Sequence, residues 1–327
     1  MVDAAASSAT ASHDRQHFRD LDGLRGVLAL AVVLLHFGFN SFVQRKFGWQ
    51  GFRFELAVDV FFILSGNVLT YAAEKGVDTT QFTVRRFLRL APVFYVTTLA
   101  TLLIDPTAWN TAELIMAVPV TGSDPANFPA WSVCWEFYLP VLAATLPLRI
   151  PDPWVRPLLA AVLLAMGLAD IEVADGERLY LLRATCGLLA GHLLYRAKLT
   201  ADLPLVPMFA GLALVMALAA YLSVFAVALP FVASLCILAG RKGGSIFASP
   251  PAQALGYLSY TLYLVHIPVL RLMQYWWGSA VDANVKLKIV GLLGSFGLAW
   301  LLSVTVERPA MRLGRLWPSR RKDKSLV

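Results

Sequence analysis

The chain has 327 residues, of which 58% are hydrophobic and only 15% are charged, and its mean hydropathy is +0.64. Soluble domains have about half apolar and a quarter charged residues, so this composition excludes an ordinary soluble domain and predicts an integral membrane protein. The net charge of +7 fits basic loops on one side of a membrane, and nucleic acid is not expected as a partner.

Apolar segments near the length of about 20 residues that crosses a bilayer recur along the whole chain. They predict an all-α, polytopic membrane protein with about ten transmembrane helices. The expected helices are 22–40, 56–73, 86–104, 131–148, 157–171, 180–195, 204–222, 224–240, 254–277 and 287–306. The segment 112–120 is too short to cross and is expected to lie at the interface or to re-enter.

The distribution of basic residues predicts the orientation of these helices. With the N-terminus in the cytoplasm, 20 of the 28 lysines and arginines fall on the cytoplasmic side, and 8 fall outside, Arg183 among them. This asymmetry favours both termini in the cytoplasm. Residues 1–17 lack the pattern of a cleaved signal peptide, so the first helix is expected to be a signal-anchor. The expected domains are a short polar tail at 1–20, a membrane domain at 21–309 and a basic tail at 310–327.

The first predicted helix, within "LDGLRGVLALAVVLLHFGFN", carries Arg25 and His36. His36 lies about 16 Å beyond Arg25 along the axis, and both face the same side because eleven residues make about three turns. A cavity running from the cytoplasmic surface to mid-membrane would explain the pair, since ionisable groups inside a membrane are usually functional. The alternative is that Arg25 extends to the headgroups and His36 bonds to a neighbouring helix.

The second predicted helix contains "AVDVFFILSGN". An unpaired carboxylate at Asp59 would cost a few kcal/mol near the outer face, so a His or Arg is expected beside it. Ser65 and Gly66 indicate close helix packing.

The third helix opens "FTVRRFLRLAPVFY". Positive-inside topology accounts for Arg85, whereas Arg86 and Arg89 share one face and could hold a phosphate in bidentate fashion. The fourth helix, "PAWSVCWEFYLP", places Glu136 toward the outside among interfacial aromatic residues, and the ninth, "LSYTLYLVHIPVL", places His266 near mid-membrane.

Together these residues predict two mid-membrane histidines, two carboxylates toward the outside and arginines toward the cytoplasm. Such a column suits an anionic ligand that enters from the cytoplasm. Because the histidines can serve as bases or as proton relays, the residues alone leave both an enzyme and a transporter open. Cys134, Cys186 and Cys236 lie in apolar segments and predict neither a disulfide framework nor a metal site.

Six motifs occur in order between residues 21 and 309: "LDGLRGVLALAVVLLHF", "VDVFFILSG", "RRFLRLAP", "WSVCWEFY", "LSYTLYLVHIPV" and "ERP". In this order they resemble the acyltransferase-3 family of integral membrane acyltransferases. The resemblance implies a ten-helix enzyme of the bacterial inner membrane that takes an acyl-CoA, usually acetyl-CoA, from the cytoplasm. It implies acylation of sugar hydroxyls, often on cell-surface polysaccharides, with membrane lipid, a carbohydrate acceptor and polysaccharide-synthesis proteins as partners.

The resemblance also implies roles for individual residues. His36 would be the catalytic histidine, with Asp59, Glu136 and His266 at further catalytic positions. The donor-binding arginines would be Arg25, Arg86 and Arg89. Two features depart from the family pattern: Asn67 replaces a large apolar residue, which affects the expected acceptor pocket, and the Phe-Tyr pair follows Glu136 directly.

Acyl transfer to an alcohol requires a base, an oxyanion donor and orientation of the substrates. His36 is the expected base, with Asp59 or Glu136 fixing its tautomer. His266, Ser132 or Trp135 could donate to the oxyanion. Direct transfer is predicted, with an acyl-enzyme on His36 or Ser65 as the alternative. Two other functions stay open: a tailoring acyltransferase for small molecules, and a transporter or flippase.

Overall fold

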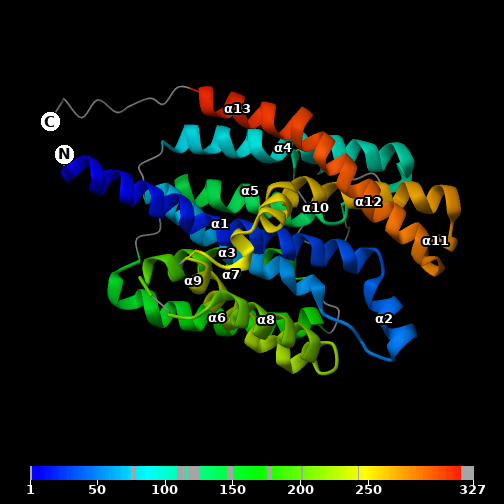
Figure 1. Ribbon diagram of the computed structural model, residues 1–327, viewed down its shortest axis with the longest axis horizontal. Coiled ribbons are helices and arrows are strands. Elements are labelled where there is room, and N and C mark those ends of the chain that lie inside the picture. The colour runs from blue at the N-terminus through cyan, green and yellow to red at the C-terminus, as the bar shows by residue number, and fades with distance from the viewer. Residues whose placement is uncertain are drawn as a thin grey trace. The chain divides into compact units, whose positions relative to one another are not determined.

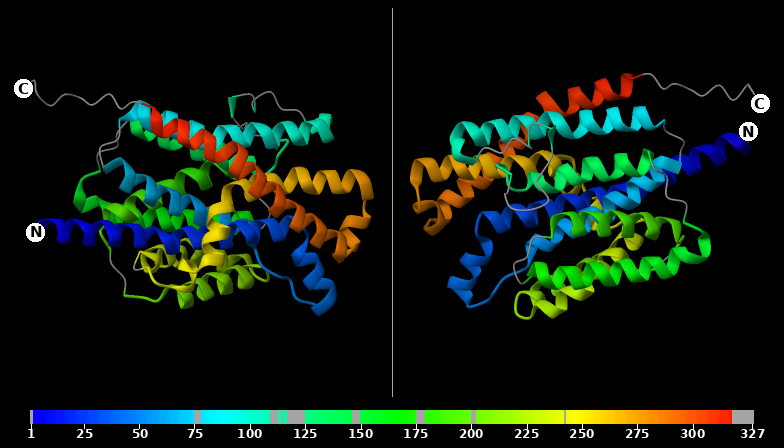
Figure 2. Two further views of the ribbon diagram at one scale, coloured as in Figure 1. Left: turned by 45° about the horizontal axis from the view of Figure 1, so that its top comes forward. Right: turned by 180° about the vertical axis from the view of Figure 1, so that it is seen from behind.

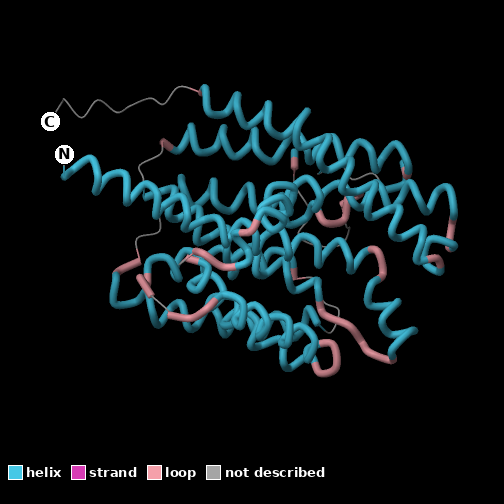
Figure 3. The backbone as a smooth tube through the Cα atoms, in the orientation of Figure 1, coloured by secondary structure: helices cyan, strands magenta, loops and turns pink. Residues whose placement is uncertain are grey.

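The computed structural model describes residues 2–74, 78–108, 113, 115–116, 125–145, 150–174, 179–199, 202–241 and 243–317, with the side chains of 2–18 and 282–283 excepted. The described residues form helices and loops without a strand (Figure 3), which confirms the predicted all-α class for that part of the chain. They divide into two compact units, residues 1–67 with 151–263, and residues 68–150 with 264–327.

The first unit contains the N-terminal helices and the middle of the chain (Figure 1). Its elements are α1 (Val2–His36), α2 (Phe39–Phe47), η1 (Phe54–Leu56), the first part of α3 (Ala57–Glu74), α6 (Asp152–Ala174), α7 (Tyr180–Arg196), α8 (Leu205–Ala219), η4 (Ser223–Ala228), α9 (Leu229–Gly240), η5 (Ile246–Ala248) and the first part of α10 (Pro250–Trp277). Helix α6 packs on α7, η4 and α9, and α1 packs on η5 and α9.

Small residues let the helices of this unit approach closely. A Cβ on Gly191 of α7 would lie 2.0 Å from the Ile63 carbonyl oxygen of α3, and one on Gly66 would lie 2.2 Å from the Leu188 carbonyl oxygen. The packing predicted for the Ser-Gly step is therefore confirmed at Gly66. Asn67 belongs to the same contact, because its side-chain amide donates to the Gly191 carbonyl oxygen at 3.4 Å.

The second unit contains the rest of α3 and α10 with α4 (Thr79–Ile104), η2 (Pro106–Ala108), α5 (Ala130–Thr145), α11 (Ala280–Ala283), α12 (Val285–Leu302), the π-helical turn η6 (Ser303–Glu307) and α13 (Arg308–Leu316). Helices α4 and α13 lie side by side in both views of Figure 2. Arg85 of α4 donates from Nε to the Gly314 carbonyl oxygen of α13 at 3.3 Å.

Each of the ten predicted segments contains a helix, but several boundaries differ: α4 starts at Thr79 instead of residue 86, and α6 starts at Asp152 instead of residue 157. The first helix ends at His36 instead of residue 40, because Gly38 adopts a left-handed conformation (φ +72°) and α2 starts at an angle of 68° to α1. Residues 146–148 of the fourth predicted helix, most of 112–120 and residues 318–327 of the predicted basic tail lie outside the described residues.

Among the described residues, five helices are long and apolar enough to cross a membrane: 54–74, 79–104, 152–174, 223–240 and 285–316. The bent pair 19–36 and 39–47 makes a sixth if it is one broken crossing. Helices α5, α7 and α8, with 16, 17 and 15 residues, are shorter than the usual span. The protein is thus an integral membrane protein, while ten crossings and the orientation of the termini stay predictions.

Candidate active site

His36 is the last residue of α1, immediately before the bend. Its Nδ1 lies 2.9 Å from the carbonyl oxygen of Val32, one turn back in the same helix. A carbonyl oxygen only accepts, so Nδ1 carries the proton in this contact and Nε2 is the basic nitrogen of the neutral ring. The tautomer that was expected to depend on Asp59 or Glu136 is set here by the backbone.

Helix α1 is held in place around Arg25 by close backbone contacts. A Cβ on Gly23 would lie 2.0 Å from the Phe247 carbonyl oxygen, and one on Gly26 would lie 2.3 Å from the Gly256 backbone nitrogen. One turn earlier, Asp20 accepts a hydrogen bond from the Ser245 backbone N–H at 3.1 Å. These contacts fix the height and rotation of the half-buried Arg25, and through the same helix those of His36.

Asp59 forms a buried ion pair with Arg183. Arg183 donates from Nε to one carboxylate oxygen at 3.0 Å and from a terminal nitrogen to the other at 2.6 Å. The side chain of Asp59 is 0% exposed and that of Arg183 is 5% exposed. The cation expected beside Asp59 is thereby confirmed. Arg183 lies in the first turn of α7, which starts at Tyr180, and its guanidinium is buried; its place toward the outer side stays a prediction.

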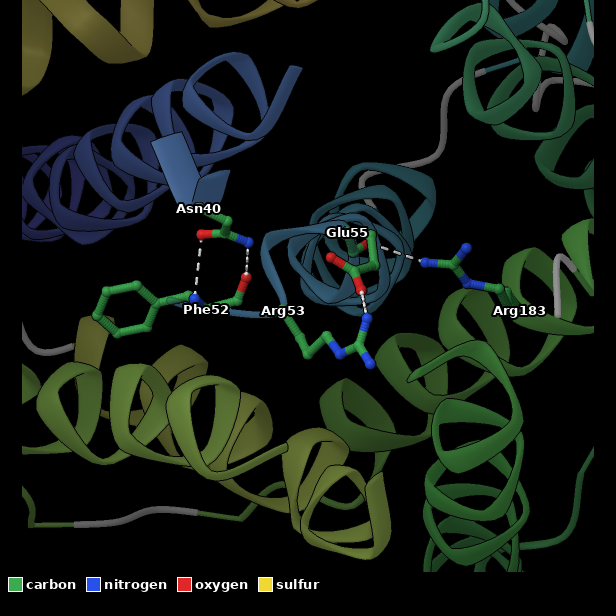
Figure 4. A network of polar contacts seen from close by, with 5 residues as sticks. All are labelled: Asn40, Phe52, Arg53, Glu55 and Arg183. Carbon is green, nitrogen blue, oxygen red and sulfur yellow. Dashed lines mark hydrogen bonds and ion pairs between the residues drawn. The ribbon is translucent and has the colours of Figure 1, made fainter. Parts of the chain in front are cut away.

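Polar contacts hold the segment between the bend and α3, the helix that carries Asp59 (Figure 4). The Asn40 side chain donates to the Phe52 carbonyl oxygen at 2.6 Å and accepts from the Phe52 N–H at 3.2 Å. Arg53 pairs with the Glu55 carboxylate at 3.3 Å, and Arg183 donates to the Glu55 carbonyl oxygen at 2.9 Å. Arg183 therefore joins the start of α3 to α7.

In the second unit, Arg86 of α4 contacts Glu136 of α5. Its Nε and a terminal nitrogen donate to the Glu136 carbonyl oxygen, and that nitrogen lies 3.4 Å from the Glu136 carboxylate. The hydroxyl of Thr79 donates to the Ala144 carbonyl oxygen, so the two helices run antiparallel. The predicted separation of Arg86 on the inside from Glu136 on the outside is wrong for this pair: the two residues lie at one level.

Three candidates for the oxyanion donor also lie in the second unit. Trp135 has a buried indole Nε1 that meets no hydrogen-bond acceptor in the described part of the chain. Ser132 donates to the Pro129 carbonyl oxygen at 3.1 Å, which places it in the first turn of α5. His266 is fully buried in α10, and Asn127 donates to the Leu264 carbonyl oxygen two residues earlier at 2.9 Å.

The predicted site residues thus divide between the units. Arg25, His36 and Asp59 belong to the first unit, and Arg86, Arg89, Glu136 and His266 belong to the second. Within the described residues, no cluster of three or more His, Cys, Asp or Glu side chains could hold a metal ion.

The model of one protein family, described as an acyltransferase domain, matches residues 18–306. The chain belongs to this family. The predicted family is therefore confirmed, and the chain carries an acyltransferase domain. The match covers all seven predicted site residues. No solved structure matches the chain.

Three curated proteins are similar to part of the chain. They are a peptidoglycan O-acetyltransferase, OatA, of Listeria monocytogenes (33% identical over 93 residues), a putative peptidoglycan O-acetyltransferase, YrhL, of Bacillus subtilis (37% over 93) and a protein named "Protein 2 in picA locus" of Rhizobium radiobacter (41% over 84). These matches cover 27%, 26% and 24% of this chain and 14%, 13% and 41% of the relatives. The chain therefore spans less than half of each relative.

Two polar residues of the buried interior were missed by the sequence interpretation as site candidates. Arg183 stands in "YLLRATCGLLAG", where it is the only charged residue, and Asp170 stands in "AMGLADIEVA", which also carries Glu172. The signal that could have found Arg183 is the unpaired charge of Asp59, which requires a cation from another helix. Asp170 carries the same kind of signal, since it lies inside the predicted helix 157–171.

Proposed function

We propose that this protein is a membrane O-acyltransferase that moves an acetyl group from acetyl-CoA in the cytoplasm to a hydroxyl of a sugar in a cell-surface or exported polysaccharide. The observation that carries the proposal is His36, a histidine whose Nδ1 is held by its own helix, inside an acyltransferase domain that covers residues 18–306. The named activities of two relatives support acetyl transfer to a polysaccharide.

The chemistry follows from the tautomer of His36. Its Nε2 accepts the proton of the acceptor hydroxyl as the alkoxide oxygen attacks the thioester carbonyl carbon. The tetrahedral oxyanion is stabilised by a hydrogen-bond donor, for which the Trp135 indole N–H and His266 are our candidates. When the intermediate collapses, the C–S bond breaks and the coenzyme A thiolate leaves with the proton that His36 had taken. The proton count therefore balances without a metal ion or an acyl-enzyme.

The arginines and carboxylates receive different roles in this proposal. Arg25 and Arg89 bind the phosphates of the donor, for which a guanidinium is well suited. Arg86 and Glu136 hold α4 to α5, since each contacts the other. Asp59 acts as a positioning residue through Arg183, because both of its oxygens accept from that guanidinium.

The setting of the enzyme is proposed on the same grounds. We propose ten membrane crossings with both termini in the cytoplasm, a membrane domain at 21–309 between two cytoplasmic tails, and a place in the bacterial inner membrane. Proteins of polysaccharide synthesis would then supply the acceptor.

The test measures release of free coenzyme A from acetyl-CoA by the full chain in detergent, with and without a panel of sugar acceptors. The His36→Ala variant is expected to lose about 10²–10⁴-fold in rate, the usual contribution of a general base. The matched control is His192→Ala, which removes a histidine from α7 of the same unit and should keep the activity.

Three results would contradict the proposal. Equal rates for the parent and His36→Ala would remove His36 from the chemistry. A labelled acetyl group trapped on the protein without acceptor would replace direct transfer by an acyl-enzyme. Transport of an unmodified substrate across the membrane of proteoliposomes, without release of coenzyme A, would show that the protein is a transporter.

A further inference from the structure

Asp170 is a buried carboxyl group that lacks a hydrogen bond at both of its oxygens within the described residues. It lies near the end of α6 and is 0% exposed. Neither of its carboxylate oxygens accepts a hydrogen bond from any residue that the structure describes. An ionised carboxylate in such a place would be deprived of both water and donors, which is among the most unfavourable arrangements in a folded protein.

The elements packed against α6 offer few groups that could compensate a charge on Asp170. The charges that act on Asp170 are those of Asp59 and Arg183. Asp170 in turn acts on Cys186 of α7, and η1, which packs against α6, carries Glu55. Helix α9 carries Cys236, whereas η4, with the sequence SVFAVA, carries no ionisable side chain. Gly167, one turn before Asp170, lies directly against the Val227 carbonyl of η4, so the wall on that side is tightly packed.

The two cations of this cluster are already engaged, since Arg53 pairs with Glu55 and Arg183 pairs with Asp59. The charges of Asp59 and Arg183 both act on Asp170. Arg183, however, gives two hydrogen bonds to Asp59 and one to the Glu55 carbonyl oxygen. One guanidinium facing two ionised carboxylates would leave a net negative charge in the interior of a membrane protein. The charge balances when one carboxylate is protonated, and Asp59, with both oxygens bonded to Arg183, is the ionised one.

We propose that Asp170 is a buried proton-binding site, a neutral carboxylic acid in the folded protein at neutral pH. The proton comes from solvent when the chain folds, so the folded state holds one proton more than the unfolded state. While the proton is bound, Arg183 stays on Asp59. When it leaves, two carboxylates compete for one guanidinium. This site is independent of the acyl transfer proposed above.

Infrared spectroscopy of the full chain in detergent tests the protonation directly. Protein labelled with ¹³C at the aspartate carboxyl groups is expected to show the carbonyl band of a protonated acid, shifted by the label. The band should vanish in Asp170→Asn and persist in Asp152→Asn, a control on the same helix whose carboxylate is exposed and paired with Arg196. A spectrum without this band, or a band that Asp170→Asn leaves unchanged, would overturn the proposal.

The pH dependence of unfolding gives a second readout. One extra proton in the folded state makes the folding equilibrium constant fall by about tenfold for each pH unit above neutrality. Asp170→Asn should remove this slope, and Asp152→Asn should keep it. An identical slope in Asp170→Asn would overturn the proposal, as would sodium ions restoring the stability of the parent at alkaline pH, because a sodium ion would then be the ligand.

If Asp170→Asn does not fold, the Asp170→Glu variant can be used to assign the acid band in its place. The acid band must then leave the aspartate-labelled spectrum and enter the spectrum of protein labelled at glutamate carboxyl groups. A band that stays with the aspartate label would assign the proton to another residue and overturn the proposal.

Discussion

Replacing Asp59 by asparagine removes one charge from the buried pair with little change in shape. Asparagine keeps an acceptor oxygen, but the buried Arg183 guanidinium would lose the ionised partner to which it gives two hydrogen bonds. Because Arg183 also donates to the Glu55 carbonyl oxygen, it cannot turn toward solvent without breaking the start of α3. The charge must therefore be carried inside the first unit, and the folded protein becomes less stable.

The size of the effect follows from the burial of both partners. The side chains of Asp59 and Arg183 are 0% and 5% exposed, so solvent screens their attraction very little. Two unit charges about 4 Å apart attract by roughly 4 kcal/mol at an effective dielectric constant of about 20. Removing one partner of a buried pair costs about 3–5 kcal/mol in measured cases. We expect a loss of about 3–5 kcal/mol in the free energy of unfolding for Asp59→Asn.

The assay is denaturant-induced unfolding of the purified protein in detergent, with a matched pair as the control. Arg196 and Asp152 form an ion pair at 2.7 Å with side chains 25% and 90% exposed. Asp152→Asn should cost no more than about 1 kcal/mol, since exposed pairs contribute little. The double replacement Asp59→Leu with Arg183→Met should recover most of the stability, because apolar side chains of similar volume can replace a buried pair.

Two outcomes would refute this reasoning. If Asp59→Asn and Asp152→Asn cost the same, burial would not determine the strength of the pair. If the double replacement were as unstable as the sum of its two single replacements, the loss would come from packing and not from charge.

Two further predictions concern packing and pH. Gly191→Ala should destabilise the protein by about 1–3 kcal/mol, because the new methyl group would overpack α7 against α3. Gly297→Ala in α12 is the control and should be neutral or stabilising, since nothing lies within 4 Å of the new Cβ. Equal thermal unfolding midpoints for the two variants would contradict the close approach of α7 and α3. The hydrogen bond from the Thr107 hydroxyl, and then the charge of Arg271, hold the pKa of Asp105 below its usual value of 3.8. A lowered carboxyl pKa stabilises the folded state at pH values above the unfolded-state pKa, and this stabilisation is lost as the pH falls through the folded-state pKa. Asp105→Asn should therefore flatten the acid limb of a curve of stability against pH. An unchanged limb would show that Asp105 contributes nothing to it.

The helices could be predicted from the sequence because their signal is the length of each apolar run. Helix α3 was expected at 56–73 and lies at 57–74, and α7 was expected at 180–195 and lies at 180–196. The bend after His36 was missed, because hydropathy continues through the bend and only the left-handed conformation of Gly38 reveals it. Hydropathy measures burial, and it carries little information about the direction of the backbone.

The polar contacts could be predicted only in part. The cost of a charge in hydrocarbon predicted that Asp59 has a cationic partner, but nothing in the spacing of residues identifies a partner 124 positions away. The same limitation affected Arg86 and Glu136, which were assigned to opposite sides of the membrane from their distances to the helix ends. Helix α4 begins at Thr79, seven residues before Arg86, so Arg86 lies two turns inside the helix and at the level of Glu136.

The contacts in the described residues separate two kinds of polar residue that share the same motifs. Asp59, Arg86 and Glu136 are each bonded to a residue on another helix of their own unit, so their charges are compensated inside the protein and join helices. The ring of His36 is oriented by the Val32 carbonyl oxygen of its own helix. A base whose tautomer is set by a backbone carbonyl keeps its orientation while its other ring nitrogen gains and loses a proton. This difference is the structural reason to place the proton transfer of the proposed reaction on His36 and to assign the paired charges to positioning.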